Sequence, residues 1–375
     1  MEYLENNHIT NCLTPILELP SKNSIPNFDN GSFLNKTFLE AYENHIKQVE
    51  KGNTNSLFLS KTANTWMQEA MKQPIPKKLF DVFWIEGEVC ILFASSNVGK
   101  SILAVQIADS ISRGIPIQGF DFDAGKQSVL YCDFELTSKQ FQIRYSDENN
   151  NPYTWDSDFK RVEINPSAEI PFGKTYEDYF NDCLESEIKR NNFRVLIIDN
   201  LTYLRSDTEK AKDASELMKH LKRLKNKYGL SVLVLAHTPK RDETKQIAMN
   251  DLAGSSMLMN FCDTSFTIGR SCIDKDLRYI KQLKARSTEI KFDSENVATC
   301  QISKSDNFLK FDFIDVSFEW KHLKQETEND KNKKLHEAIK MNQQGVTNIE
   351  IAKHFGVSEG AIRKWIKKGE KQAHE

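Results

Sequence analysis

Short apolar runs alternate with amphipathic stretches through the middle of the chain, from Phe58 to Ser317. Several runs, including CILFA, VLIID and SVLVLA, are apolar throughout, which is typical of strands buried on both faces of a parallel sheet. The predicted strands are Val89–Ala94, Ser128–Asp133, Arg161–Asn165, Arg194–Asp199, Ser231–Ala236 and Thr264–Arg270. Apolar spacings of three and four between them predict the helices Ile102–Ser112, Tyr176–Asn191 and Glu209–Tyr228. The pattern predicts an α/β fold with a mostly parallel sheet flanked by helices.

Different patterns precede and follow this region. Four segments are expected to form an antiparallel end of the sheet: Leu277–Ala285, Thr288–Phe292, Val297–Ser303 and Phe308–Val316. Residues 321–334, KHLKQETENDKNKK, are charged and polar, and a new helical pattern follows them. We expect a flexible arm at 1–55 with one short helix at Leu34–Val49, a core at 56–320, a charged linker at 321–332 and a small all-α domain at 333–375.

The composition fits one large domain with a small appendage, because the chain has 375 residues, 39% hydrophobic and 28% charged. The formal net charge of -2 excludes an overall basic surface, so any nucleic-acid contact must be local. The seven cysteines are scattered, without a Cys-x-x-Cys pair, which favours a reduced compartment and no zinc site. No run of about eighteen apolar residues occurs, so we expect a cytoplasmic protein that does not span a membrane.

The segment ILFASSNVGKS has the order strand, loop and helix start that a phosphate-binding loop requires. Gly99, Lys100 and Ser101 fill the last three places of G-x-x-x-x-G-K-[ST], and Ala94 stands at the first glycine, where a methyl is tolerated if φ is negative. A chance Gly-Lys-Ser in a turn is the alternative, which the flanking strand and helix disfavour. The predicted ATP-binding residues are Ser95, Ser96, Asn97, Val98, Gly99, Lys100, Ser101 and Ile102.

Hydrolysis also needs a metal ligand and a group that orients water. Asp199 ends an apolar strand and is expected to hold Mg²⁺ together with Ser101, although Asp-Asn also begins turns. Glu135 follows another strand and is the expected catalytic base. Asp133 is the second candidate, and capping of the helix near Thr137 is the structural alternative for these carboxylates.

His237 ends a third apolar strand, on the edge where the other candidates gather. Two interpretations stay open: it senses the γ-phosphate, or it only hydrogen-bonds the next loop. None of the eight histidines has metal-ligand spacing.

These segments together resemble the RecA-like ATPases, and more closely the ring helicases of the DnaB and plasmid RepA type, over Glu88–Glu289. The most specific motif is E-x-x-x-x-Q-x-x-x-R, present as Glu135, Gln140 and Arg144. The resemblance implies a RecA-like fold, ATP and Mg²⁺ as cofactors, and a homo-oligomer, expected to be a hexamer, with ATP sites between subunits.

Further segments carry the same resemblance. Residues 251–270, DLAGSSMLMNFCDTSFTIGR, are similar to the family's Asp-Leu-x-x-Ser segment, which lines the DNA channel. KQLKARSTEI is similar to the Lys-x-Arg finger, which implies that Lys284 and Arg286 act at the neighbouring subunit's nucleotide. From spacing alone, an exposed strand with ordinary basic residues is the simpler interpretation.

Departures from the family favour a plasmid or mobile-element ATPase over a replicative DnaB protein. The chain shows no counterpart of the helical N-terminal domain of DnaB, and His237 stands where Gln is frequent. Loop 239–250 carries Lys240, Arg241 and Lys245 and is expected to follow single-stranded DNA in a ring centre, with a solvated loop as the equal alternative.

The C-terminal segment GVTNIEIAKHFGVSEGAIRKWIKK predicts a helix-turn-helix. Its expected buried side chains are Ile351, Ala352, Phe355, Val357, Ile362 and Trp365. Its expected duplex-DNA contacts are Ser358, Arg363, Lys364, Lys367 and Lys368. A three-helix module for protein contacts is the alternative. A DNA-acting helicase is the leading functional prediction, a regulatory ATPase that binds DNA without unwinding is the second, and a metabolic kinase is disfavoured because no acceptor lid is apparent.

Overall fold

The structure is a computed structural model that describes residues 58–201, 210–239, 241–252, 255–325, 328–355 and 357–372. The expected arm at 1–55, its helix at Leu34–Val49, the Lys240 side chain and the Lys368 side chain lie outside the described residues. The chain divides into two compact units, Met1–Pro74 and Ile75–Glu375. Helix α2 (Ala63–Ala70) belongs to the first unit.

A nine-stranded sheet organises the second unit, with the order β11-β10-β9-β8-β3-β7-β6-β4-β5. The strands from β3 to β8 run parallel, and β9, β10 and β11 add antiparallel strands at one side. Their bounds are β3 Val89–Ala94, β4 Val129–Asp133, β5 Phe159–Val162, β6 Val195–Asp199, β7 Ser231–His237, β8 Thr264–Arg270, β9 Leu277–Lys284, β10 Val297–Ser305 and β11 Phe308–Ser317. The predicted fold class, a mostly parallel sheet flanked by helices, is confirmed.

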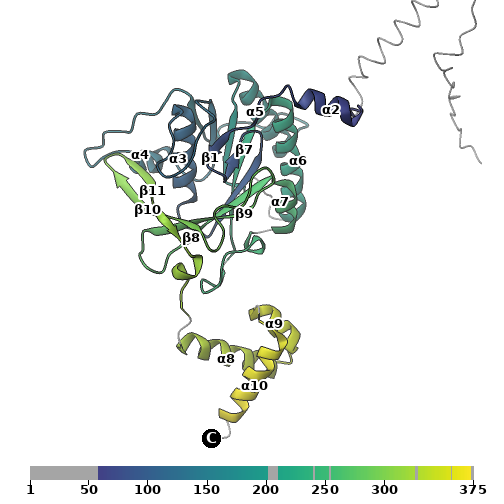
Figure 1. Cartoon of the computed structure of the whole chain (residues 1–375), viewed down its shortest axis with the longest axis vertical. Helices are drawn as coiled ribbons and strands as arrows, with labels where there is room; N and C mark the ends of the chain where they lie inside the picture. The colour runs from purple at the N-terminus through teal and green to yellow at the C-terminus, as the bar shows by residue number, and fades with distance from the viewer. Residues whose placement is uncertain are drawn as a thin grey trace, which may run out of the picture. The chain divides into compact units, whose positions relative to one another are not determined.

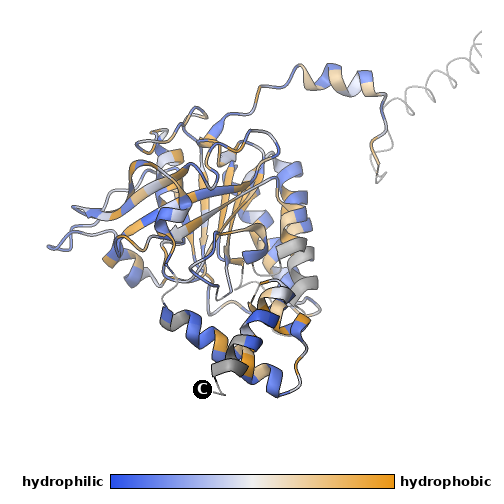
Figure 2. Ribbon diagram, turned by 60° about the horizontal axis from the view of Figure 1, so that its bottom comes forward, coloured by the Kyte–Doolittle hydropathy of each residue, from blue (hydrophilic) through white to orange (hydrophobic). Residues whose placement is uncertain are grey.

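Helices cover both faces of this sheet (Figure 1). Helix α3 (Lys100–Arg113) packs on one face, and α5 (Tyr176–Asn191), α6 (Lys210–Tyr228) and α7 (Ser255–Phe261) pack on the other. Alternate residues of β3 enter different cores, because Leu92 packs with α3 and Ile91 packs on the opposite face. This double burial explains the uninterrupted apolar runs, which Figure 2 shows between helices with hydrophilic outer surfaces.

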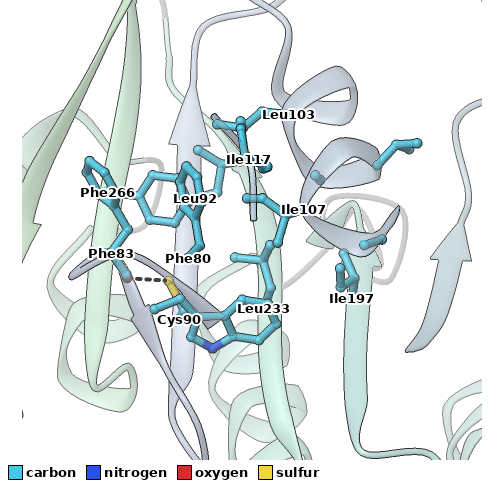
Figure 3. Close-up of a cluster of buried hydrophobic side chains, with 14 of the residues drawn as sticks. Phe80, Phe83, Cys90, Leu92, Leu103, Ile107, Ile117, Ile197, Leu233 and Phe266 are labelled. Atoms are coloured by element: carbon cyan, nitrogen blue, oxygen red, sulfur yellow. Dashed lines mark hydrogen bonds between the residues drawn. The ribbon is translucent and has the colours of Figure 1, made fainter. Parts of the chain in front are cut away.

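The α3 side of the core places Leu103 and Ile107 against Leu92 and Leu233 of two adjacent strands (Figure 3). An aromatic group extends this cluster from a two-stranded hairpin that the apolar pattern did not predict. The hairpin consists of β1 (Lys78–Phe80) and β2 (Trp84–Ile85). The core therefore fixes the helix that follows the phosphate-binding loop.

Two predicted strands need correction. The predicted strand Arg161–Asn165 is displaced, because β5 runs from Phe159 to Val162 and Phe159 packs into the core. The predicted strand Thr288–Phe292 is wrong. The Gln282 side chain accepts hydrogen bonds from the backbone N of Lys291 (2.8 Å) and of Phe292 (3.0 Å), and Gln282 N donates to Phe292 O (2.7 Å), so one residue takes the place of a strand partner.

The C-terminal part forms three helices, α8 (Glu328–Gln343), α9 (Asn348–Phe355) and α10 (Glu359–Gln372). Their core contains the six side chains expected from the sequence, together with Ala338, Met341, Val346 and Ile366. Helix α8 begins within the predicted linker 321–332. The 3-10 helix η3 (Glu319–His322) overlaps the start of that linker, and its Glu319 and His322 side chains are buried. Within the described residues, no helix combines the length and apolar character needed to cross a bilayer.

Candidate nucleotide-binding site

Gly99 closes the phosphate-binding loop in a conformation that requires glycine. Its φ is +105°, in the left-handed region that side chains with a Cβ rarely adopt. A Cβ built on Gly99 would also lie 2.8 Å from Cζ of Phe311. Helix α3 begins at the next residue, Lys100, so its first backbone N–H groups face the loop.

Ala94 meets the condition under which it can replace the first glycine of the motif. It is the last residue of β3, it pairs in parallel register with His237, and its φ is not positive. Its carbonyl oxygen accepts hydrogen bonds from Thr238 N and Lys100 Nζ, each at 3.1 Å. The methyl group of Ala94 is therefore accommodated in an ordinary strand position.

Lys100 is almost fully buried at the base of the loop, with 6% of its surface exposed. Its Nζ donates to the carbonyl oxygens of Ala94 (3.1 Å) and Ser95 (3.3 Å) and lies 3.2 Å from Nδ1 of His237. Burial lowers the pKa of Lys100, while the charges of Glu135 and Asp199 oppose that shift. The ammonium group is thus held by neighbours at the point where phosphate is expected.

Asp199 is completely buried at the end of β6. Its Oδ2 accepts a hydrogen bond from Tyr131 Oη at 2.7 Å, whereas its buried Oδ1 has no hydrogen-bond partner among the residues that the structure describes. Burial raises the pKa of Asp199 to about 6, and the nearby Ser101 hydroxyl counteracts this. A buried oxygen without a partner is costly unless a cation or donor occupies it, so Asp199 and Ser101 fit a Mg²⁺ site.

Glu135, His237 and Asn200 form a hydrogen-bonded cluster beside the loop. Nε2 of His237 lies 3.2 Å from Oε1 of Glu135, and Asn200 Nδ2 donates to the same oxygen. Lys100 donates to Nδ1, and Asn200 Nδ2 lies 2.9 Å from Nε2, so Nε2 serves both the contact with Asn200 and the hydrogen bond with Glu135. This hydrogen bond lowers the pKa of Glu135 against the opposing effect of burial. The carboxylate is therefore kept ionised.

Asp133, the second candidate for the base, is fully engaged in supporting the chain. Its Oδ1 accepts from the backbone N of Glu135 (3.2 Å) and of Leu136 (2.9 Å), and its Oδ2 accepts from Arg161 Nε (2.8 Å). Helix α4 (Ser138–Arg144) is capped by Thr137, which forms a capping box with Gln140, so Glu135 has no capping role. Of the two candidates for the base, Glu135 is the one that lines the cavity.

A cavity of about 500 Å³ lies between the phosphate-binding loop, Glu135 and His237, and its volume is in the range of small-molecule sites. Of the predicted ATP-binding residues, Val98 instead packs in the core and Ser95 lines the adjacent space behind the loop. The lining residues are Ser96, Asn97, Gly99, Lys100, Ser101, Ile102, Glu135, Arg144, His237, Asp276, Arg278 and Ile302.

Sequence reasoning missed Arg278, which comes from β9 and is almost fully buried. Its Nε donates to the carbonyl oxygen of Val98 at 3.0 Å, and Arg270 NH2 donates to that of Asn97 at 3.2 Å. The two arginines thus hold the loop from the antiparallel side of the sheet. A sequence motif does not identify these two arginines, because the backbone carbonyls that they contact are 173 and 180 residues away along the chain.

Lys284 and Arg286 do not reach this chain's loop. Nζ of Lys284 donates to the carbonyl oxygen of Cys262 at 2.8 Å, and Arg286 NH1 lies 3.1 Å from Oδ1 of Asp263. Asp263 N donates to Val89 O, at the start of β3, whereas the loop follows its end. A six-residue strand is about 20 Å long, so the two basic residues lie near the start of β3, at the end of the strand opposite to the loop.

The predicted single-strand loop is anchored rather than free at Ile247. Its backbone N donates to Glu319 Oε1 at 2.8 Å and its carbonyl oxygen accepts from Lys281 Nζ at 2.9 Å. Arg241 is mostly buried, lies 3.5 Å from Asp251, and donates to the carbonyl oxygen of Lys245. Lys245 itself is exposed.

The predicted duplex contacts Ser358, Arg363, Lys364 and Lys367 are all exposed in the C-terminal helices. Oγ of Ser358 accepts from Ala361 N at 3.3 Å, as its expected capping role requires. Arg363 pairs with Glu359 at 2.8 Å on the surface of α10.

One comparison with known protein families covers the nucleotide site. Residues 58–243, slightly less than half of the chain, match the family model of an AAA domain. Among solved structures, the chain is similar to a KaiC-like protein from the hyperthermophilic archaeon Pyrococcus horikoshii OT3, at 14% identity, with 61% of this chain and 90% of that chain covered and a TM-score of 0.42. Curated proteins give no match. The AAA-domain match spans the loop, Glu135, Asp199 and His237, and supports a P-loop ATPase core.

Proposed function

We propose that this chain hydrolyses ATP at the cavity between the phosphate-binding loop and Glu135. The observation that carries the proposal is that Glu135, Asp199 and His237, which end or follow three different strands, lie around Lys100 at the start of α3, directly after the glycine that closes the loop. The AAA-domain match over the same residues supports it.

Each residue has a chemical role in this proposal. Lys100 neutralises phosphate charge, and Glu135 accepts the proton of the attacking water. Ser101 and Asp199 would hold Mg²⁺, which neutralises charge on the phosphate oxygens when bound. His237 contacts both Lys100 and Glu135, so it is suited to link the phosphate to the base.

Two variants test the ATPase. Lys100→Ala should remove binding of a fluorescent ATP analogue, whereas Glu135→Gln should bind it within about twofold of wild type and lose turnover by about 10²- to 10⁴-fold. Glu148→Gln, at an exposed residue, is the matched control and should behave as wild type. Normal turnover by Glu135→Gln would remove Glu135 from the mechanism.

We further propose that the ATPase is a DNA-acting motor, a ring-forming RepA/DnaB-like helicase of a plasmid or mobile element. The exposed basic residues of α10 support contact with duplex DNA. The distance of Lys284 and Arg286 from this chain's own loop supports their service to a neighbouring subunit in a hexamer. Single-stranded DNA would pass through that ring.

Forked-duplex unwinding tests the motor, with ATP turnover measured with and without single-stranded DNA. Stimulated turnover and strand displacement are expected. Truncation after Gln325, before α8, should preserve ATPase activity and weaken duplex binding. Duplex binding without displacement would favour the second candidate, a regulatory ATPase, and unchanged duplex affinity of the truncated protein would indicate a protein-contact module.

A further inference from the structure

Arg161 contacts the segment that carries Glu135 although it lies on a different strand. Its Nε donates to Oδ2 of Asp133 at 2.8 Å, and its NH2 donates to the carbonyl oxygen of Leu136 at 2.6 Å. Its third nitrogen, NH1, pairs with Glu163, and the guanidinium group lies 4.6 Å from the ring centroid of Phe141. Each of the three guanidinium nitrogens is thus engaged, and 15% of the side chain is exposed.

Asp133 passes this restraint to Glu135. Its Oδ1 accepts from the backbone N of Glu135 and of Leu136, while Phe134 N donates to the carbonyl oxygen of Asp199 at 2.8 Å. Residues 134–136, between β4 and α4, form neither helix nor strand. These hydrogen bonds therefore define the path of the backbone there. The Asp133 carboxylate has no exposed surface, and a buried carboxylate needs a cation beside it, which Arg161 provides.

We propose that Arg161 is a positioning residue for Glu135, acting through Asp133 and the Leu136 carbonyl. The inference rests on the proposed ATPase. Arg161 does not line the nucleotide cavity, so its loss should leave binding intact and displace the base. Because a misplacement of about 1 Å costs about 10²-fold in rate, we expect kcat of Arg161→Ala to fall by about 10- to 100-fold.

Arg161→Lys provides a conservative comparison. A lysine can pair with Asp133, but a single ammonium group cannot also span Leu136 O and Glu163 in the way the planar guanidinium does. We expect its kcat to lie between wild type and Arg161→Ala. Arg190→Ala, on the exposed face of α5 with its side chain 71% exposed, is the matched arginine control and should match wild type.

The experiment measures kcat, KM and the dissociation constant for an ATP analogue, with thermal unfolding as a check of folding. The proposal expects kcat to fall while the dissociation constant stays within about twofold. In a Glu135→Gln background, Arg161→Ala should cause no further loss, because both changes disable the same group. If Arg161→Ala does not fold, Arg161→Lys and Asp133→Asn carry the same comparison.

Three results would overturn the inference: unchanged kcat in Arg161→Ala, equal weakening of binding and turnover, or a full additional loss in the Glu135→Gln background. A folded wild-type protein that binds the analogue without turnover would reject the ATPase itself and, with it, this role of Arg161. A wild type that hydrolyses ATP while Arg161→Ala is unaffected rejects only the positioning role.

Discussion

His237 lies with its Nε2 3.2 Å from Oε1 of Glu135, so the residue that ends β7 contacts the residue that follows β4. The other ring nitrogen, Nδ1, lies 3.2 Å from Nζ of Lys100. One imidazole therefore bridges the lysine of the phosphate-binding loop and the proposed base. This bridge is the contact on which the proposed sensor role of His237 rests.

The first prediction concerns the acidic side of the ATPase pH profile. A general base works only when deprotonated, so kcat falls as pH decreases through its pKa. The hydrogen bond from His237 is the largest influence that lowers the pKa of Glu135, and burial raises it. His237→Ala removes the first influence and leaves the second, so activity should be lost at a higher pH than in wild type.

The pH dependence of kcat for both proteins provides the measurement. His336→Ala, an exposed histidine on α8, is the control and should keep the wild-type profile. An acidic limb that stays in place, or moves to lower pH, in His237→Ala would show that His237 does not set the ionisation of Glu135.

The second prediction separates the two glycine positions of the loop motif. Gly99→Ala should abolish binding of the ATP analogue, because φ is +105° and its Cβ would collide with Phe311. Ala94→Gly restores the usual motif but should change affinity by less than about threefold, since Ala94 already adopts an ordinary strand conformation. Gly125→Ala, also at positive φ but with open space around it, controls for local strain. A large gain from Ala94→Gly would contradict this account.

The third prediction addresses the orientation of Asp199. The Tyr131 hydroxyl donates to Oδ2, while Oδ1 has no partner in the described part of the chain, an arrangement in which Tyr131 orients Asp199 as a potential metal ligand. Tyr131→Phe should raise the Mg²⁺ concentration needed for half-maximal nucleotide binding by about 10- to 100-fold. A Mg²⁺ titration of analogue binding measures this. Tyr153→Phe, which removes a hydrogen bond to Asp109 instead, should leave the Mg²⁺ dependence unchanged.

The sheet was predictable because burial on both faces leaves a continuous apolar signal. Strands β3 and β8 have the predicted bounds, and each is buried over nearly its full length. The same reasoning failed at Thr288–Phe292, where one residue of β9, Gln282, hydrogen-bonds the backbone of Lys291 and Phe292 in place of a paired strand. An apolar pattern does not show which partner a segment's N–H groups will find.

The candidate site was predictable where residues follow strands in chain order, as Glu135, Asp199 and His237 do. Arg161 and Arg278 were not, because each acts on backbone carbonyls or on a carboxylate that belongs to another strand. Their contacts follow from strand order in the folded sheet. A local sequence motif gives no information about the strand order.

The last prediction concerns the buried ion pair between Lys281 and Glu319, which lie 2.5 Å apart with 9% and 0% of their side chains exposed. Lys281→Met leaves an unpaired carboxylate in the interior and removes the donor to Ile247 O, so we expect a loss of about 3–5 kcal/mol in the free energy of unfolding. Urea denaturation measures the change. Lys174→Met, which breaks an exposed pair with Asp182, is the control and should leave the urea midpoint close to that of wild type.

Adding Glu319→Gln to Lys281→Met distinguishes charge from hydrogen bonding. Glutamine is neutral and can still accept from Ile247 N, so the double variant should recover part of the lost stability. Full recovery is not expected, because Ile247 O still lacks the ammonium donor. A double variant less stable than Lys281→Met would show that an unpaired charge is not the main cost, and that the Ile247 backbone contacts dominate.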